Sequence, residues 1–398
     1  NSSISGSFGG TFEHFVNTGN VDKVTGQSSA SFTGDVRFDD TTTGTVTVTG
    51  GSLQLTAGDL TDWTPSVALG ADLFVAFDAS SAVRGTFDAT GLGTSTWSGQ
   101  ITAPADLVLS FEPGEWVNKV DTWAADPGAT ITNASSFPID TNIQFTTDFV
   151  NDGTVTQRPF TTVTLGDGNL IANAGTWRFD GNTRIIGTIG GIGGHFVNTG
   201  TVEKITGNST ATVRDGVRFD DATPTGAVTV TAGSLQLDAG TLSDWTPAVA
   251  AGAALSVGFD AQSAIAGTFD ATGLGTSTWS GDISPTSNVV LSFEEGEWVD
   301  DVTSWTPAPN VTITNDSFFP IDASTTISDA FTNLAGATVA QRDFTHVQIA
   351  DGGTIANAGT WRLANGASMN GVLDGLTEQF ANSGLLIAND PKGFANIG

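Results

Sequence analysis

An internal duplication constrains this chain more than any other feature. The stretch HFVNTG at His14 returns at His195, and FDATGLGTSTWSG at Phe87 returns at Phe269, a shift of about 182 residues. All ten Trp residues recur in matched pairs between the two copies. Duplication on this scale is typical of architectures in which neighbouring units share one continuous core. The sequence therefore predicts two tandem repeats of one unit.

A shorter motif recurs inside each unit: an apolar residue, any residue, Asn, any residue and Gly. Successive copies lie about 22 to 25 residues apart, which is the length of one coil of a β-solenoid. Stacked coils would place the motif Asn side chains in an amide ladder, and the Gly would permit the positive φ of a corner. The predicted ladder residues are Asn17, Asn151, Asn173, Asn198, Asn333, Asn357 and Asn382.

Composition favours strands over helices. The chain has 50 Gly and 25 Phe, together with abundant Thr and Val, and it shows almost no helical periodicity. We therefore expect an all-β, parallel β-helix, right-handed by the general rule for parallel crossovers. The middle of each unit, residues 51–130 and 233–312, lacks the Asn motif, so we expect irregular coils or an inserted β segment there.

The repeat positions give the expected domain organisation. Residues 1–14 would close a preceding unit, 15–195 and 196–379 would form the two repeats, and 380–398 would start a third unit or form an open end. No polar cap is evident at either end, whereas solenoids normally protect their terminal strands. Two alternatives follow: the chain is an excerpt of a longer array, or its open ends stack head to tail.

The Asn-Gly coils, seen in FVNTG, FVNDGTV and IANAGTW, carry a resemblance. They are similar to the β-helical repeats of large bacterial surface and secreted proteins, namely autotransporter passengers and filamentous-haemagglutinin-like adhesins. The resemblance covers most of the chain, and its motifs report coil geometry. It implies a β-helix exposed outside the cell and serving as an adhesin or its stalk.

Charge and cysteine content narrow the partners. A formal net charge of -29 would repel nucleic acid and anionic lipid, and it suits an extracellular setting where salt screens the charge. With no Cys, the chain has neither disulfides nor thiolate metal sites. No apolar run is long enough to span a membrane as a helix. We expect an extracellular or cell-surface location, with neither nucleic-acid binding nor membrane insertion.

Paired acidic residues raise the question of a metal. Carboxylate oxygens at corners are ligands that Ca²⁺ prefers, and the pairs recur in both units in the sequences FDD and EPGEW or EEGEW. Solvated turn residues are the alternative interpretation. No other cofactor is required by the sequence. The candidate calcium ligands are Asp39, Asp40, Asp220, Asp221, Glu112, Glu115, Glu294 and Glu297.

Carbohydrate is the alternative ligand. Trp97 and Trp279 lie in the polar sequence GTSTWSG, where they would be accessible for stacking on sugar rings, or else would anchor loops in the core. The Glu pairs could cleave a glycosidic bond only if two carboxyl groups face each other across a groove. The sequence carries no ordered set of catalytic residues of the polygalacturonase type. An ice-binding face is disfavoured because regular T-x-T rows are absent except in short pieces such as TVTVT.

These observations predict a structural protein rather than an enzyme: a subunit of an extracellular filament, surface layer or adhesin stalk that associates head to tail. The runner-up is a carbohydrate-binding or carbohydrate-cleaving β-helix, which would have cell-surface glycan as its partner. Duplication favours the first hypothesis, because a scaffold explains why nearly every candidate residue occurs twice.

Overall fold

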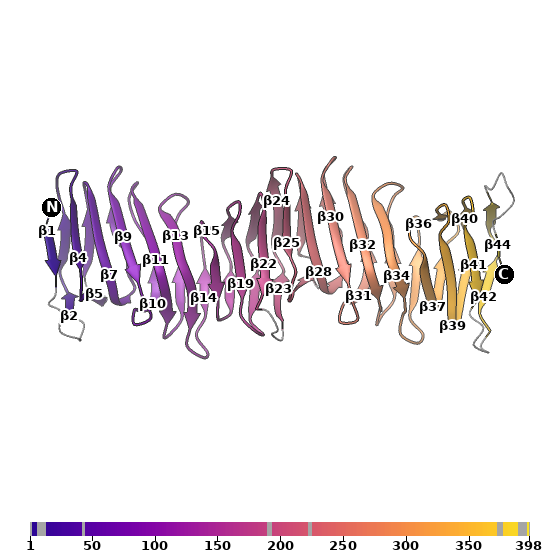
Figure 1. Cartoon of the computed structure of the whole chain (residues 1–398), viewed down its shortest axis with the longest axis horizontal. Coiled ribbons are helices and arrows are strands. Elements are labelled where there is room, and N and C mark those ends of the chain that lie inside the picture. The colour runs from indigo at the N-terminus through magenta and orange to yellow at the C-terminus, as the bar shows by residue number, and fades with distance from the viewer. Residues whose placement is uncertain are drawn as a thin grey trace. The chain divides into compact units, whose positions relative to one another are not determined.

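The computed structural model describes residues 2–5, 13–41, 44–188, 193–221, 225–371, 377–388 and 396–397, and within these ranges every regular element is a β-strand (Figure 1). The chain divides into two compact units. The first comprises Asn1–Phe196 with Asp215–Val217, and the second comprises Val197–Arg214 with Arg218–Gly398. The described residues contain no helix long and apolar enough to cross a membrane.

The strands of the first unit are β1 (Ser2–Ser5), β2 (Glu13–Asn17), β3 (Asn20–Lys23), β4 (Ser29–Thr33), β5 (Val36–Thr41), β6 (Thr45–Val48), β7 (Ser52–Thr61), β8 (Ser66–Val67), β9 (Asp72–Phe77), β10 (Ala82–Phe87), β11 (Thr94–Ala103), β12 (Leu107–Leu109), β13 (Trp116–Ala125), β14 (Ile131–Asn133), β15 (Ser136–Ile139), β16 (Ile143–Phe145), β17 (Phe149–Asn151), β18 (Thr154–Gln157), β19 (Thr162–Leu165), β20 (Leu170–Asn173), β21 (Thr176–Asp180) and β22 (Thr183–Gly187). Two strands contain residues of both units, β23 (Gly194–Asn198) and β26 (Val217–Asp221).

The strands of the second unit are β24 (Thr201–Thr206), β25 (Thr210–Val213), β27 (Ala227–Val230), β28 (Ser234–Ser243), β29 (Ala248–Val249), β30 (Ala254–Phe259), β31 (Ala264–Phe269), β32 (Thr276–Ile283), β33 (Val289–Leu291), β34 (Trp298–Trp305), β35 (Thr312–Asn315), β36 (Phe318–Ile321), β37 (Thr325–Asn333), β38 (Thr338–Gln341), β39 (His346–Asn357), β40 (Thr360–Leu363), β41 (Ser368–Gly371), β42 (Gln379–Asn382), β43 (Leu385–Ala388) and β44 (Asn396–Ile397).

Strand pairing makes each unit a parallel β-solenoid. In the first unit β17 pairs with β20, β18 with β21 and β19 with β22, all in parallel, so each strand bonds to the strand three positions further along the chain. One coil therefore contributes three strands, and each lies directly on its counterpart in the next coil. In the second unit β35, β37, β39 and β42 form the same kind of column. The predicted all-β parallel solenoid is confirmed.

The core lies inside the coils and is rich in aromatic rings. Along β30 half-buried and buried side chains alternate, as a strand with one inward face requires. Rings from successive coils meet edge to face: the centroids of Trp97 and Phe111 are 5.0 Å apart, and those of Trp177 and Phe196 are 5.3 Å apart. Such pairs contribute about 0.5–1.5 kcal/mol each beyond their burial. Aromatic stacking thus helps fix the register between coils.

The middle of each unit continues the parallel stack, so the predicted insertion of a β segment is wrong. The predicted irregularity appears instead as β-bulges: β13 has one extra residue opposite Gly99 and Gln100 of β11, and β34 has one extra residue opposite Gly281 and Asp282 of β32. Gly99 has a φ of 95°, and a Cβ at this position would collide with the carbonyl oxygen of Phe77. Only glycine fits such a bulge. The predicted domain boundaries and coil handedness stay predictions.

Candidate functional site

Buried asparagines form a ladder through the last coils of the first unit. Asn133 on β14 donates from Nδ2 to Oδ1 of Asn151 on β17 at 2.7 Å, and Asn151 donates to Oδ1 of Asn173 on β20 at 2.6 Å. All three side chains are buried. Asn151 Nδ2 also bonds the carbonyl oxygen of Thr176 at 3.1 Å. The ladder therefore ties one coil to the next inside the fold, where an unpaired amide would be costly.

The second unit contains a longer ladder. Nδ2 of Asn315 donates to Asn333 at 2.7 Å, Asn333 donates to Asn357 at 2.6 Å, and Asn357 donates to Asn382 at 2.6 Å. Sequence reasoning missed Asn315 and its equivalent Asn133, because neither is followed by the motif Gly. The apolar-x-Asn pattern alone, in ITNAS and ITNDS, was the signal that could have found them.

Two predicted ladder residues bond to aspartate instead of asparagine. Asn17 Nδ2 donates to Oδ2 of Asp40 on β5 at 3.1 Å, and Asn198 Nδ2 donates to Oδ2 of Asp221 on β26 at the same distance. Asp40 Oδ2 also accepts the Nε1 proton of Trp63 at 3.1 Å. The second Asp of each FDD sequence thus occupies the position that Asn takes in other coils, and both carboxylates are buried.

Burial governs the ionisation of these two carboxyl groups. Desolvation raises the pKa of Asp221 to about 6, against hydrogen bonding from Asn198, which favours the charged form. The pKa of Asp40 is likewise raised by burial, against hydrogen bonds from Asn17 and Trp63. Oδ1 of Asp221 is buried without a hydrogen-bond partner. With a pKa of about 6, Asp221 changes its charge within about one pH unit of neutrality.

The first Asp of each FDD sequence supports the backbone of the next coil. Asp39 Oδ1 accepts the amide proton of Asp59 at 2.7 Å, and Asp39 Oδ2 lies 2.6 Å from Nδ1 of His14. Asp220 Oδ1 accepts the amide proton of Thr241 at 2.6 Å. These oxygens already have protein partners. Among the described residues there is no group of three or more His, Cys, Asp or Glu side chains that could hold a metal ion.

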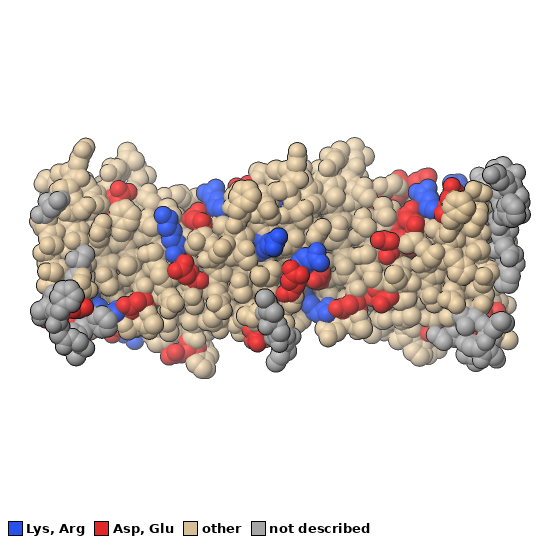
Figure 2. Space-filling view, in the orientation of Figure 1, with Lys and Arg blue, Asp and Glu red and all other residues tan. Residues whose placement is uncertain are grey.

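The Glu pairs lie on turns at the surface. Glu115 Oε2 accepts the amide proton of Glu112 at 2.9 Å, and Glu297 Oε2 accepts that of Glu294 at 2.9 Å. Each second Glu therefore closes its own turn, just before β13 and β34. On the face drawn in Figure 2, acidic and basic side chains are interspersed and uncharged residues cover most of the surface. Calcium binding by the eight carboxylates stays a prediction.

The expectation that Trp97 and Trp279 are accessible is wrong. They lie on strands β11 and β32, and their exposed fractions are 0% and 1%. The Trp97 ring packs against Phe77 at 5.2 Å and against Trp116 at 5.6 Å between ring centroids. In a strand, alternate side chains point to opposite faces, so the Thr and Ser neighbours face outward while Trp faces the core. Neither ring can stack on a saccharide.

Sequence reasoning missed one further buried polar position. Asn118 on β13 and its repeat equivalent Asp300 on β34 are 0% and 1% exposed. Burial, with a lesser contribution from the neighbouring carboxylates of Asp322 and Asp301, raises the pKa of Asp300 well above its ordinary value. The only sequence signal was the exchange of Asn for Asp between two copies of a Trp-bounded segment.

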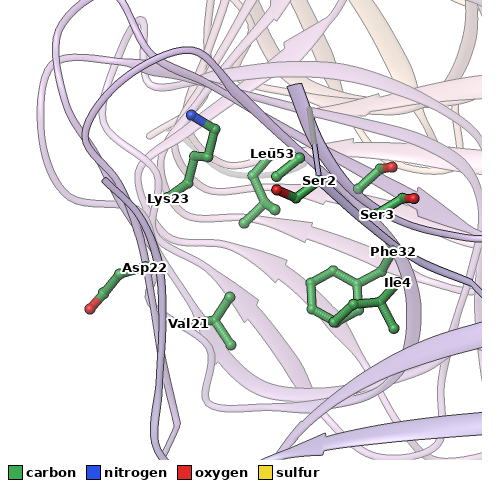
Figure 3. Close-up of a pocket in the computed structure, with 10 residues that line it drawn as sticks. Ser2, Ser3, Ile4, Val21, Asp22, Lys23, Phe32 and Leu53 are labelled. Carbon is green, nitrogen blue, oxygen red and sulfur yellow. The ribbon is translucent and has the colours of Figure 1, made fainter. Parts of the chain in front are cut away.

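A small cavity lies at the coil that contains β1, with a volume of about 180 Å³ (Figure 3). Ile4 pairs in register with Phe32 of β4, and both side chains line this cavity with Val21 and Leu53. Ile4 is 45% exposed, whereas its repeat equivalent Ile185 on β22 is fully buried. The cavity therefore presents side chains of the type that fill the core elsewhere.

Comparisons of the chain with protein-family models, with curated proteins and with solved structures gave no match. The pairing pattern nevertheless defines the class: a parallel β-solenoid protein. Hydrogen bonds between buried Asn and Asp side chains link its successive coils. The β-helical part of the resemblance to bacterial surface proteins is confirmed by this fold. Kinship with autotransporter or adhesin families stays a prediction.

Proposed function

We propose that the chain is an extracellular structural protein, a segment of a filament, surface layer or adhesin stalk, and that it acts through the stacking of its coils. The observation that carries the proposal is the buried ladder of amide and carboxyl groups described above. It links successive coils and reappears in both units. A scaffold uses polar side chains in this way, and the proposal assigns no catalytic step to the chain.

Assembly is proposed to occur head to tail between copies. The support is the exposed apolar surface around Ile4, together with Leu385 of β43, which is 56% exposed. A further coil from a second copy would cover Ile4 as the core covers Ile185. The net charge of -29 opposes such contact, so salt and divalent cations, which screen or bind carboxylates, should promote it.

Electron microscopy and sedimentation velocity of the purified chain test this proposal, in 0.5 M salt with either Ca²⁺ or a chelator. Wild type is expected to form particles longer than one chain at rising concentration. Ile4→Asp places a charge in the proposed contact and should abolish them. Leu69→Asp is the matched control, because Leu69 is 78% exposed on a turn, and it should assemble like wild type.

Monodisperse single chains under all these conditions would overturn the assembly proposal. Equal loss in the two variants would show that added charge alone prevents association.

A further inference from the structure

Two exposed phenylalanines occupy equivalent turns in the two units. Phe160 and Phe344 are 82% and 75% exposed, and their φ angles are 66° and 58°. A bulky residue with positive φ is a genuine conformational outlier, and it persists only where the surrounding structure imposes it. Both turns thus hold an aromatic ring outside the core at a conformational cost. A ring maintained in this way in both copies calls for a role at the surface.

The turn in the first unit is held from beneath. Gln157 is fully buried, and its Nε2 donates to the carbonyl oxygens of Thr161 at 3.2 Å and Arg184 at 2.9 Å. The amide of Phe160 donates to the carbonyl oxygen of Asn182 in the next coil at 2.5 Å. The backbone under the ring is therefore fixed on both sides.

The turn in the second unit is built in the same way. Gln341 Nε2 donates to the carbonyl oxygens of Thr345 at 3.0 Å and Ser368 at 2.8 Å, and the amide of Phe344 donates to Asn365 at 2.9 Å. The repeated construction indicates that the backbone carrying the ring is fixed before any ligand arrives. Binding would therefore cost little backbone conformational entropy.

An ion pair accompanies each ring. Arg158, two residues before Phe160, is 55% exposed and lies 3.6 Å from Asp140 between Nε and Oδ1. Arg342, two residues before Phe344, is 56% exposed and lies 3.0 Å from Asp322 between the same atoms. Each turn therefore carries a flat apolar surface together with a charged donor and a charged acceptor that remain accessible to solvent.

We propose that each of these turns binds a neutral saccharide, with the Phe ring stacked on the apolar C–H face of a pyranose and the Arg–Asp pair hydrogen-bonded to its hydroxyl groups. A pyranose with equatorial hydroxyls, such as β-linked glucose or N-acetylglucosamine, has a flat C–H face of this kind. A few fixed polar groups beside an aromatic surface are the usual means of orienting a ligand. The charge of -29 disfavours acidic saccharides.

Saccharide binding at these turns is separate from the structural role proposed for the coils. Its stacking residues are the two Phe rings instead of the predicted Trp97 and Trp279, which are buried. One turn per unit predicts two sites per chain, and each should act without the other.

Isothermal titration calorimetry of the full chain with cellohexaose and with the hexamer of N-acetylglucosamine tests the proposal. Wild type is expected to bind one of the two with a stoichiometry of two. Phe160→Asn and Phe344→Asn should each reduce the stoichiometry to one, and the double variant should lower affinity at least tenfold. Asn tolerates positive φ, so the melting temperature of the variants should equal or exceed that of wild type.

A matched control removes exposed apolar side chains elsewhere. Leu92 and Leu274 are repeat equivalents on another turn, 77% and 86% exposed, and the double substitution Leu92→Asn with Leu274→Asn should bind like wild type. Phe160→Trp with Phe344→Trp should retain binding. The proposal is overturned if wild type binds neither hexamer, if the Leu control loses binding equally, or if the Phe variants alter only self-association in sedimentation, which would indicate a second copy as the partner.

Discussion

Asn118 of the first unit and Asp300 of the second fill the same buried position with different chemistry. In both, Oδ1 accepts a backbone amide proton two residues further along, at 3.1 Å from Val120 and at 3.3 Å from Val302. The other side-chain atom, Asn118 Nδ2 or Asp300 Oδ2, is buried without a hydrogen-bond partner. Each coil therefore offers this side chain one backbone hydrogen-bond donor and no charge compensation.

The difference teaches that the fold specifies a neutral polar group at this position. An amide is neutral at every pH, whereas a carboxyl is neutral only when protonated. Burial, the leading cause, raises the pKa of Asp300 well above its ordinary value, and the carboxylate of Asp322 adds to this effect. Asp300 therefore makes the stability of the second unit depend on pH, whereas Asn118 at the same position adds no pH dependence to the first unit.

The largest expected effect comes from exchanging the two residues. A raised pKa stabilises the folded state fully below the unfolded value of about 4, and this contribution is lost as pH rises. Asp300→Asn should thus stabilise the protein by about 3 kcal/mol at pH 7.5 and hardly at all at pH 3.5, and Asn118→Asp should destabilise it to a similar extent at pH 7.5. Chemical denaturation followed by Trp fluorescence at both pH values measures these changes.

The control for this exchange is Asp301→Asn, an adjacent carboxylate that is exposed and removes the same charge. It should change the free energy of unfolding by less than about 0.5 kcal/mol. An equal gain from Asp301→Asn would mean that lowering the net charge, rather than relieving burial, stabilises the second unit.

A smaller effect is expected where a carboxyl group takes the place of a ladder Asn. The pKa of Asp221 is raised by burial to about 6, so its contribution to stability falls as pH rises from about 4 to about 6. Asp221→Asn should stabilise the protein by about 2 kcal/mol at pH 7.5, with no gain at pH 3.5. The unfolding free energy, measured across this range, should become flatter between pH 4 and 6.

Asp40→Asn in the first unit sharpens the same comparison. Burial also raises the pKa of Asp40, so Asp40→Asn should give a gain of the same sign that grows as pH rises. If either substitution destabilised the protein at pH 7.5, the carboxylate itself would be required at that position, and the idea of a neutral ladder would be wrong for these coils.

Much of the fold could be predicted because the spacing of the repeated Asn motif equals the length of one coil. The spacing of Asn151 and Asn173 equals one coil, and the two side chains are indeed bonded to each other. The metal-ligand interpretation of the FDD sequence rests on the chemistry of carboxylates alone and stays a prediction, whereas the ladder position of the second Asp could not be predicted. Only the register shows that Asp40 lies directly above Asn17 in the ladder.

The errors at aromatic residues have a different physical cause. Local polarity suggested that Trp97 is accessible, whereas the period of two along a strand places it opposite to its polar neighbours. Phe160 shows the reverse problem: a Phe between Pro159 and Thr161 resembles a core residue, and only the positive φ imposed by the turn turns its ring outward. Such backbone conformations arise from contacts between coils that one coil's sequence does not contain.

The smallest expected effect concerns an ion pair that occurs at equivalent positions in the two units. Arg37 Nη2 contacts Asp78 Oδ2 at 2.5 Å, and Arg218 Nη2 contacts Asp260 Oδ2 at 2.6 Å, but Arg37 is 2% exposed and Arg218 is 21% exposed. Burial opposes ionisation of Asp78, yet hydrogen bonds from Arg37 and Ser80 outweigh it and lower its pKa, while the bond from Arg218 lowers the pKa of Asp260. Both pairs therefore stabilise the fold above pH 4 and lose that effect as pH falls.

Removing the carboxylate should destabilise the two units to different extents. Asp78→Asn removes the carboxylate that contacts the buried Arg37 guanidinium. It should cost about 1 kcal/mol more at pH 7 than Asp260→Asn, because Arg218 is more exposed and keeps a hydrogen bond to Gln262 Oε1 at 3.1 Å. Denaturation in 0.1 M and 1 M salt measures this, and salt should reduce the cost of Asp260→Asn more. Equal costs at both salt concentrations would mean that the burial of Arg37 adds nothing, and that the two units differ in their buried carboxyl groups but not in their ion pairs.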